Sequence, residues 1–272
     1  MSWRPGFAVL SAALACTGMA ACTDEEPEEA TVKIGVAAAP SLEGAFDDMI
    51  AEFEADHPDV RVTLELGRSD DIGESLAGRT DINVFASANE SVMEEVVQQG
   101  VAVDPRLFAR NHVVLAVPSG NPHGISALAD LAEPELRVGL CAVDTPCGGA
   151  ADTLLTAAGV APVDPVRNDG SRALTARLAG NELDVGIVYR TDVAASHGWV
   201  SRAVIDPEDR ELEQAAGTTR YVVARIPGGE DGPDAEAERR AAEDFLELVL
   251  SDRGRSALEA AGLGTLQGRV TP

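Results

Sequence analysis

The sequence predicts an α/β protein built from two lobes, and three observations carry this prediction. Segments typical of strands alternate along the chain with amphipathic segments typical of helices, which predicts parallel or mixed sheets with helices on both faces. A chain of 272 residues is more economically divided between two such sheets than gathered into one. A hydrophobic content of 45% is typical of a globular protein.

The first half of the chain opens with a continuous apolar run, VKIGVAA (32–38), which predicts a strand. From Ser41 to Pro58 apolar residues recur at helical spacing, and the proline ends the pattern. These apolar positions are Leu42, Phe46, Met49, Ile50 and Phe53. Beyond them we expect a strand at 60–66, a short helix at about 70–77, a strand at 81–86, and a helix opened by a capping box from Ser87 to Glu90.

The second half repeats this alternation. Strands are expected at 112–118, 136–142, 183–189 and 218–227, and helices at 148–158, 171–180 and, as a pair, at about 234–261. Because the last pair has no strands of its own, we expect it to pack back on the first lobe. The predicted lobes are residues 32–115 with 223–272, and residues 116–222.

The N-terminus is typical of an export signal. One charge precedes an alanine-rich apolar segment that is short for a membrane span, so residues 1–21 are predicted to be a signal peptide. Met19 to Cys22 resembles a bacterial lipobox, which predicts lipidation of Cys22; the alternative is a secretory signal cleaved near Ala21. The acidic run at 22–31 has no apolar periodicity and predicts a tether. We therefore expect an exported protein, held on a lipid anchor at the outer face of the cytoplasmic membrane.

Charge and missing motifs exclude several classes of function. A net charge of −25 argues against nucleic acid or an anionic membrane surface as partners, because both repel such a protein. The sequence has no G-x-S-x-G elbow, no P-loop and no H-E-x-x-H zinc helix. Structural or surface roles are expected for His57, His112, His123 and His197. We expect no catalytic residue, no cofactor and no resident metal.

Small polar residues stand where predicted strands give way to helices. Four of them open helices, and Tyr189 ends the strand at 183–189. The four are Ser41, Ser69, Cys147 and Ser171. In open α/β sheets ligands sit at the carboxyl ends of strands, where helix N-termini present unpaired N–H donors. Serine and tyrosine hydroxyls add donors without charge, so the pattern favours an anion site if these positions converge.

These residues fall within segments that resemble a known family. AAAPSL, NVFASANE, FARNHVVLAVP, PCGGAA and VGIVYRTDVAA occur in the order found in the molybdate-binding proteins of bacterial ABC importers. The resemblance runs from about Val32 to Leu263. It implies the periplasmic-binding-protein type II fold, in which two α/β lobes joined by two crossover strands close over a tetrahedral oxyanion, molybdate or tungstate. It also implies an ABC permease and its ATPase as partners of a protein that we expect to be a monomer.

The resemblance also implies the contacts to the anion. Ser41 and Ser69 would donate hydroxyl and backbone N–H groups, Cys147 and Ser171 backbone N–H groups, and Tyr189 its phenol. Two departures stand out: the second turn reads GRSDDI instead of a serine-rich sequence, and Gly170-Ser171 replaces a valine that follows an acidic residue. Asp70 and Asp71 are expected to face outward in the first helical turn, while Arg68 could compensate them or reach the ligand.

The loop CAVDTPCGGA holds two of the four cysteines. With Cys16 lost with the signal and Cys22 lipidated, Cys141 and Cys147 would be the only pair left in an exported protein, where disulfides persist. We predict a Cys141–Cys147 disulfide that holds the N–H groups of Cys147 and Gly148 in place; the alternative is free thiols.

Other functions remain open at this point. The same fold could bind sulfate, phosphate or an organic anion. An extracytoplasmic hydrolase with Ser41 or Ser69 as nucleophile would need a histidine brought close to it. A partner protein of a sensor, without a role in transport, is a third class.

Overall fold

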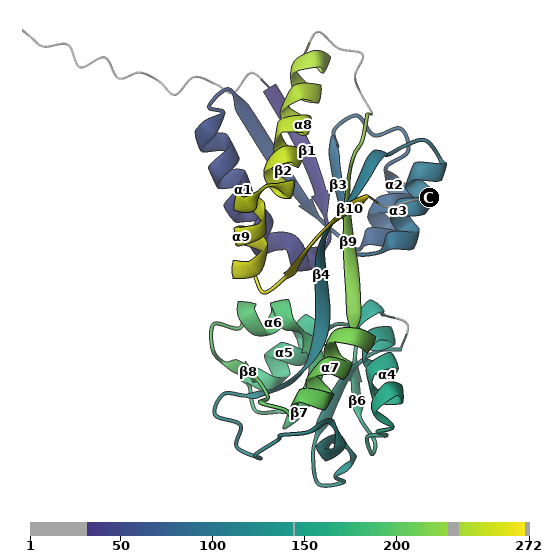
Figure 1. The fold of residues 1–272 in the computed structure, drawn as a ribbon, viewed down its shortest axis with the longest axis vertical. Helices are drawn as coiled ribbons and strands as arrows, with labels where there is room; N and C mark the ends of the chain where they lie inside the picture. Colours follow the sequence, from purple (N-terminus) through teal and green to yellow (C-terminus); the bar gives the residue numbers. More distant parts are fainter. Residues whose placement is uncertain (1–31, 144, 228–233, 270–272) are drawn as a thin grey trace, which may run out of the picture.

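The computed structural model describes residues 32–143, 145–227 and 234–269, and it shows two α/β lobes joined by a narrow waist (Figure 1). The predicted signal peptide, Cys22 and the acidic tether lie outside the described residues.

Lobe I, the upper lobe in Figure 1, is built on a mixed sheet that contains the first strands of the chain. β1 pairs in parallel with β2 on one side and with β3 on the other, and β3 pairs antiparallel with β9. β9 and β10 both pair antiparallel with β4. The bounds are β1 (Val32–Ala38), β2 (Val60–Leu66), β3 (Val84–Ser87), β4 (Val103–Pro118), β9 (Thr218–Arg225) and β10 (Gly264–Arg269).

Helices cover both faces of this sheet. One face carries α1 (Glu43–Asp56), α8 (Ala235–Leu250) and α9 (Asp252–Ala260), and the other α2 (Ser69–Ser75) and α3 (Glu90–Gln98). On the first face the ring of Phe245 meets Phe46 and Phe53 edge to face, at centroid distances of 6.1 and 5.3 Å. The two C-terminal helices therefore pack on lobe I, as their lack of strands predicts.

Lobe II, the lower lobe in Figure 1, is built around β7. β7 pairs antiparallel with β4 and in parallel with β5, which pairs in parallel with β6, while β8 pairs with the end of β4. The strand bounds are β5 (Val138–Cys141), β6 (Val166–Asn168), β7 (Val185–Tyr189) and β8 (Val200–Arg202). The helices are α4 (Pro146–Ala158), α5 (Ser171–Ala179), α6 (Arg190–Ala195) and α7 (Pro207–Ala216).

Two strands pass through the waist and join the lobes. β4 pairs with β9 up to His112 and with β7 from Val113 onward, so one strand belongs to both sheets. β9 follows α7 of lobe II in the chain and pairs with β3 in the sheet of lobe I. The predicted α/β fold with two lobes and two crossover strands is confirmed, whereas the residues at which the lobes divide along these strands stay a prediction.

One predicted helix start is wrong. Ser87 is the last residue of β3 and does not cap the next helix, which Asn89 caps by accepting a hydrogen bond from the Ser91 N–H (3.0 Å). The Ser87 hydroxyl instead donates to the Asn89 carbonyl at 2.7 Å and accepts from the Asn89 N–H at 3.0 Å. Asparagine caps as well as serine, so the sequence pattern alone could not choose between the two positions.

The strand predicted at 112–118 is also longer than expected, and several elements were not predicted. β4 begins at Val103. Asp104 has a φ of 53°, and the pairing with β9 shifts register twice, so β4 stays paired although its sequence does not alternate regularly. The unpredicted elements are α6, α7, β6, β8 and β10.

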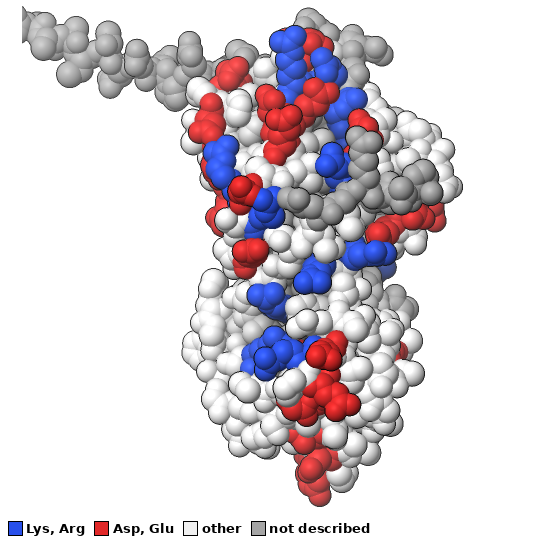
Figure 2. All heavy atoms as spheres, viewed as in Figure 1, with Lys and Arg blue, Asp and Glu red and all other residues white. Residues whose placement is uncertain are grey.

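Figure 2 shows how charge is arranged on one face of this acidic protein. Acidic and basic side chains are interspersed over α8, where Arg239 contacts Glu236 and Glu243 at 2.8 Å each. The waist carries basic side chains between the two lobes. Exposed pairs of this kind contribute little individually to the stability of the fold.

A buried glutamate attaches α7 to the strands of lobe II. Glu213 is fully buried, and its Oε1 accepts a hydrogen bond from the Leu115 N–H of β4 at 2.7 Å. Its Oε2 is paired with Arg202 of β8. Burial raises the pKa of Glu213, and the Leu115 N–H and Arg202 oppose that effect. One carboxyl group thus joins α7 and β8, which are neighbours in the chain, to β4, from which Glu213 is 98 residues away.

Replacing Glu213 by alanine is expected to lower the free energy of unfolding by about 3–5 kcal/mol, because the Leu115 N–H and the Arg202 guanidinium lose their partner. Glu213→Gln keeps an acceptor and is expected to cost less. Glu211→Ala, on the exposed side of the same helix, is the matched control and should change stability by less than about 0.5 kcal/mol. Denaturant unfolding measures all three, and equal stabilities for Glu213→Ala and the control would contradict the role of Glu213.

Candidate functional site

A cavity of about 280 Å³ lies between the two lobes. Lobe I contributes three segments that follow its strands, at 39–41, 68–70 and 88–89, and lobe II contributes 145–147, 169–172 and two side chains of β7 and α6. All five residues predicted to bind an anion line this cavity: Ser41, Ser69, Cys147, Ser171 and Tyr189. The structure therefore brings together positions up to 148 residues apart in the sequence, and that they bind a ligand stays a prediction.

Ser41 is held by a pair of buried polar side chains. Its hydroxyl lies 2.7 Å from the phenol oxygen of Tyr221, which is almost fully buried in β9. The Asn111 amide donates to the same phenol oxygen at 3.4 Å and to the Thr191 hydroxyl at 2.9 Å. Burial raises the pKa of Tyr221, so the phenol keeps its hydrogen. Because the phenol oxygen accepts a hydrogen bond from Asn111, its own hydrogen is available to donate to the Ser41 oxygen. The Ser41 hydroxyl hydrogen is then free to donate into the cavity.

Ser69 is the first residue of α2, and its hydroxyl oxygen accepts a hydrogen bond from the Ala88 N–H at 2.9 Å. The hydroxyl hydrogen is thereby free to donate. The N–H group of the first helical residue has no carbonyl partner within the helix, so it too is available. Ser69 can therefore offer a ligand two donors from one residue.

The charged residues around Ser69 pair with one another. Asp70 and Asp71 stand in the first turn of α2, where the helix dipole stabilises carboxylates. Arg68 lies 3.9 Å from each of these carboxylates. Arg68 and Asp70 also line the cavity, so the pair forms its charged rim on lobe I.

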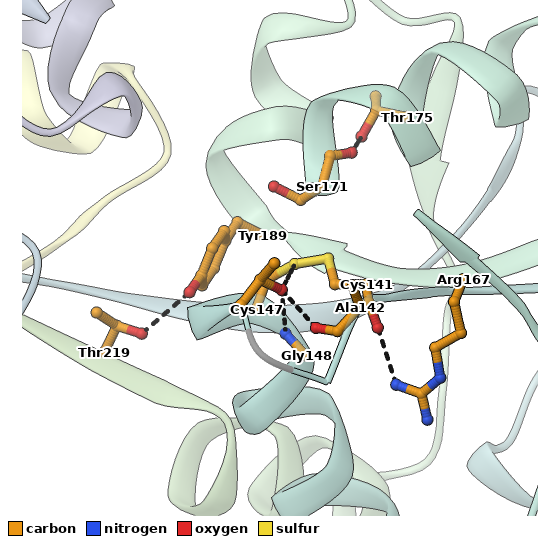
Figure 3. The surroundings of a disulfide bond; sticks show 10 residues. Cys141, Ala142, Cys147, Gly148, Arg167, Ser171, Thr175, Tyr189 and Thr219 are labelled. Atoms are coloured by element: carbon orange, nitrogen blue, oxygen red, sulfur yellow. Dashed lines mark hydrogen bonds between the residues drawn. A yellow bond between two sulfur atoms is a disulfide. The ribbon is translucent and has the colours of Figure 1, made fainter. Parts of the chain in front are cut away.

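The cysteine loop of lobe II forms a compact turn into α4 (Figure 3). A disulfide joins Cys141, the last residue of β5, to Cys147, with Cα atoms 5.8 Å apart. Thr145 caps α4: its hydroxyl accepts from the Gly148 N–H at 3.2 Å and donates to the Ala142 carbonyl at 2.7 Å. The Gly148 N–H, which the sequence analysis expected the disulfide to hold in place, is bound by the Thr145 hydroxyl. Cys147, at the second position of α4, has no carbonyl partner within the helix.

Ser171 and Tyr189 complete the side of the cavity formed by lobe II (Figure 3). Ser171 is the first residue of α5, so its N–H is unpaired within the helix. The Tyr189 phenol lies 3.4 Å from the Thr219 hydroxyl. Burial raises the pKa of Tyr189, so the phenol remains a donor at neutral pH. Each predicted contact is thus a group that can donate a hydrogen bond without carrying charge.

The residues that sequence reasoning missed at this cavity include Arg172, Asp192 and Tyr221. Arg172, in the first turn of α5, donates across the cavity to the Pro40 carbonyl at 2.8 Å and to Glu43 of α1 at 2.7 Å. It therefore ties lobe II to lobe I. Asp192 stands within the motif GIVYRTD, and Tyr221 is a polar group inside the apolar strand TTRYVVA; both were visible in the sequence, but not as cavity residues.

Two α/β lobes, two crossover strands and a cavity between helix starts define a protein with the periplasmic-binding-protein type II fold. The chain belongs to the bacterial extracellular solute-binding protein family, whose pattern matches residues 34–264.

Known proteins support this assignment. The molybdate-binding protein ModA of Mycobacterium tuberculosis is 29% identical, and the alignment covers 96% of this chain and 98% of that protein. The periplasmic molybdate-binding protein of Azotobacter vinelandii superposes with a TM-score of 0.64 at 18% identity, over 88% of this chain and 99% of that one. The sulfate-binding protein SubI of M. tuberculosis does so with a TM-score of 0.63 at 15% identity, over 85% and 86%. The fold is therefore shared by proteins named for different oxyanions.

Neither a membrane-spanning helix nor a cluster of metal ligands is present in the described part of the chain. None of its helices is long and apolar enough to cross a membrane. Within the same residues no group of three or more histidine, cysteine, aspartate or glutamate side chains is arranged to hold a metal ion.

Gly148→Ala is expected to disturb the turn into α4, because a Cβ at Gly148 would lie 1.9 Å from the Ala142 carbonyl oxygen. We expect a loss of about 1–3 kcal/mol in the free energy of unfolding. Gly149→Ala is the matched control, since a Cβ there meets nothing within 4 Å and alanine favours the helix by about 0.5–1 kcal/mol. Denaturant unfolding compares the two, and a stable Gly148→Ala would mean that the turn is not constrained.

The Cys141–Cys147 bond is expected to persist in the protein purified without reductant. Alkylation in denaturant, digestion with trypsin and mass spectrometry should leave both cysteines of this loop unmodified, and the same sample after reduction should take up two alkyl groups. Removal of the bond by Cys→Ser changes is expected to cost about 2 kcal/mol, because the loop that it closes is short. Alkylation of both thiols before reduction would show that the bond is absent.

Proposed function

We propose that this protein captures molybdate or tungstate outside the cytoplasm and delivers it to an ABC importer. The observation that carries this proposal is the convergence of Ser41, Ser69, Cys147, Ser171 and Tyr189 on one cavity between two lobes. The relative at 29% identity is named for molybdate binding, which agrees with the donors found here.

Neutral donors suffice for a dianion when they are held in place. Each hydrogen bond to a charged group contributes about 1.5–3 kcal/mol, and several together offset the loss of hydration. Backbone N–H groups at the starts of α2, α4 and α5 are rigid within their lobes, so the radius of the site is defined once the lobes have closed. Molybdate and tungstate are larger than sulfate. A site of defined radius therefore discriminates by size between anions of equal charge and shape.

Closure of the lobes provides the signal for delivery. Arg172 of lobe II contacts Pro40 and Glu43 of lobe I beside the cavity, so these contacts form when the lobes meet. An importer that recognises the surface of both lobes would engage the loaded protein in preference to the open one.

A lipid anchor at Cys22 would keep the protein close to its permease after export. The chain is a member of an extracellular family, and a Bacillus subtilis relative at 24% identity is named as a lipoprotein. The acidic tether would then hold the lobes away from the membrane surface, which repels it.

Sulfate and phosphate are the alternatives within the same fold, because a sulfate-binding protein superposes nearly as well. The hydrolase alternative has less support. Of the described residues that line the cavity none is a histidine, so a serine nucleophile there lacks the expected base.

Titration of the purified protein with oxyanions tests the proposal. We expect molybdate and tungstate at about 10 µM to raise Tm, as any ligand of the folded state does, with no effect of sulfate or phosphate at that concentration. Ser41→Ala should weaken molybdate binding about 10- to 100-fold, the equivalent of one charge-assisted hydrogen bond. Ser256→Ala, on the exposed side of α9, is the control and should bind normally. A shift with sulfate or phosphate but none with molybdate would overturn the assigned ligand.

A further inference from the structure

Asp192 places a carboxyl group where an anion is expected to bind. The residue lines the interlobe cavity although it is only 8% exposed. Its Oδ2 atom is buried, and no group in the described part of the chain donates a hydrogen bond to it. A buried carboxylate oxygen without a donor is much less favourable than a neutral carbonyl oxygen in the same place. The surroundings of Asp192 therefore favour the protonated carboxyl.

The charges around the cavity lead to the same conclusion. Two arginines, Arg68 and Arg172, and three aspartates, Asp70, Asp169 and Asp192, line it. With every group ionised the lining carries an excess of one negative charge, to which a dianion would add two more. Loss of one carboxylate charge relieves this repulsion. Asp192 is the buried one of the three, so it gives up the least hydration when it is neutralised.

The groups that face Asp192 from neighbouring elements do not cancel this preference. Burial is the largest influence on the pKa of Asp192 and raises it. A hydrogen bond from Ser171 and the charge of Arg172, both on α5, lower it, as does a hydrogen bond with the backbone of Tyr189 on β7. Burial also raises the pKa values of Tyr189 on β7 and Tyr221 on β9, so both phenols are neutral.

Other ionisable groups lie further along the same surfaces. They are Glu43 and Asp47 of α1, His197 after α6, Arg190 of α6 and His112 of β4. Glu43, Asp47 and His197 line the cavity that adjoins Asp192 on its other side, and Arg190 is exposed. Burial lowers the pKa of His112 to about 4, so this histidine is neutral and adds no charge at physiological pH.

We propose that Asp192 is protonated when the cavity holds its oxyanion, so that above the pKa of Asp192 in the free protein each dianion is bound together with one proton. The proposal rests on the function proposed above. Oδ2 would be the carbonyl oxygen of the neutral group, and the hydrogen on Oδ1 adds another uncharged donor to the site. The proton comes from the solvent. Affinity is therefore highest where the free protein already carries the proton, and it falls as pH rises above the pKa of Asp192 in the free protein.

Isothermal titration calorimetry of the full chain with molybdate tests this coupling. Binding is measured in pairs of buffers that differ in their enthalpy of ionisation, between about pH 6 and pH 9. We expect the observed heat to depend on the buffer with the sign of proton uptake, approaching one proton per anion at the upper end. Over the same range Kd should rise by up to about tenfold per pH unit.

Two variants separate this effect from a general change of charge. Asp192→Asn carries a permanently neutral group of the same shape, so it should bind molybdate with buffer-independent heat and an affinity that is flat with pH. Asp169→Asn removes an exposed carboxylate from the same cavity and should keep the proton uptake. If Asp192→Asn does not fold, the buffer series on the unchanged protein decides the matter by itself.

The outcomes distinguish the two proposals. Molybdate binding with heat that is independent of buffer, and a Kd that is flat with pH, would overturn the role of Asp192 and leave the proposed function standing. Buffer-dependent heat that persists in Asp192→Asn would likewise overturn it, because the proton would then reside elsewhere. If molybdate does not bind but sulfate or phosphate does, the same series with that anion tests Asp192. If no oxyanion binds, both proposals fail.

Discussion

The pairing of β4 with β9 through the waist is the constraint on which the rest of the structure depends. β4 belongs to the sheets of both lobes, and β9 runs beside it from α7 into lobe I. These two strands hold the lobes so that helix starts of one sheet face helix starts of the other across a cavity of about 280 Å³. Helix N-termini carry unpaired N–H groups and partial positive charge, so the arrangement suits the proposed anion site without a cluster of cations.

The polar groups of the cavity are organised at two depths. At the surface of the cavity stand donors such as Ser41 and Tyr189, and behind them lie buried groups that set their orientation, such as Tyr221 and Asn111. Buried polar groups of this kind require partners, and most of these have one. Asp192 departs from the pattern because one of its oxygens has no donor among the described residues. That departure is the basis of the proposed link between anion binding and pH.

Local sequence signals predicted most of the elements around the site. VKIGVAA, VRVTLEL and LDVGIVY are apolar or alternating runs, and they form β1, β2 and β7 within two residues of the expected bounds. The signals failed where two local choices were equally good, as at Ser87 and Asn89, or where elements were short, as in α6 and β8. They also failed along β4, whose bulged pairing with β9 depends on a strand more than 100 residues away.

By itself the sequence determined the α/β alternation, the serines and tyrosine at strand–helix junctions, and the cysteine pair beside α4, because these depend on local periodicity and on neighbouring residues. Only the tertiary structure decided that Thr145 uses the Gly148 N–H, that Arg172 reaches Pro40 and Glu43 in the other lobe, and that Tyr221 lies behind Ser41. Such contacts join residues that are up to 180 positions apart. The burial of Asp192 likewise depends on how α5, α6 and β7 pack together, which no local pattern in the chain encodes.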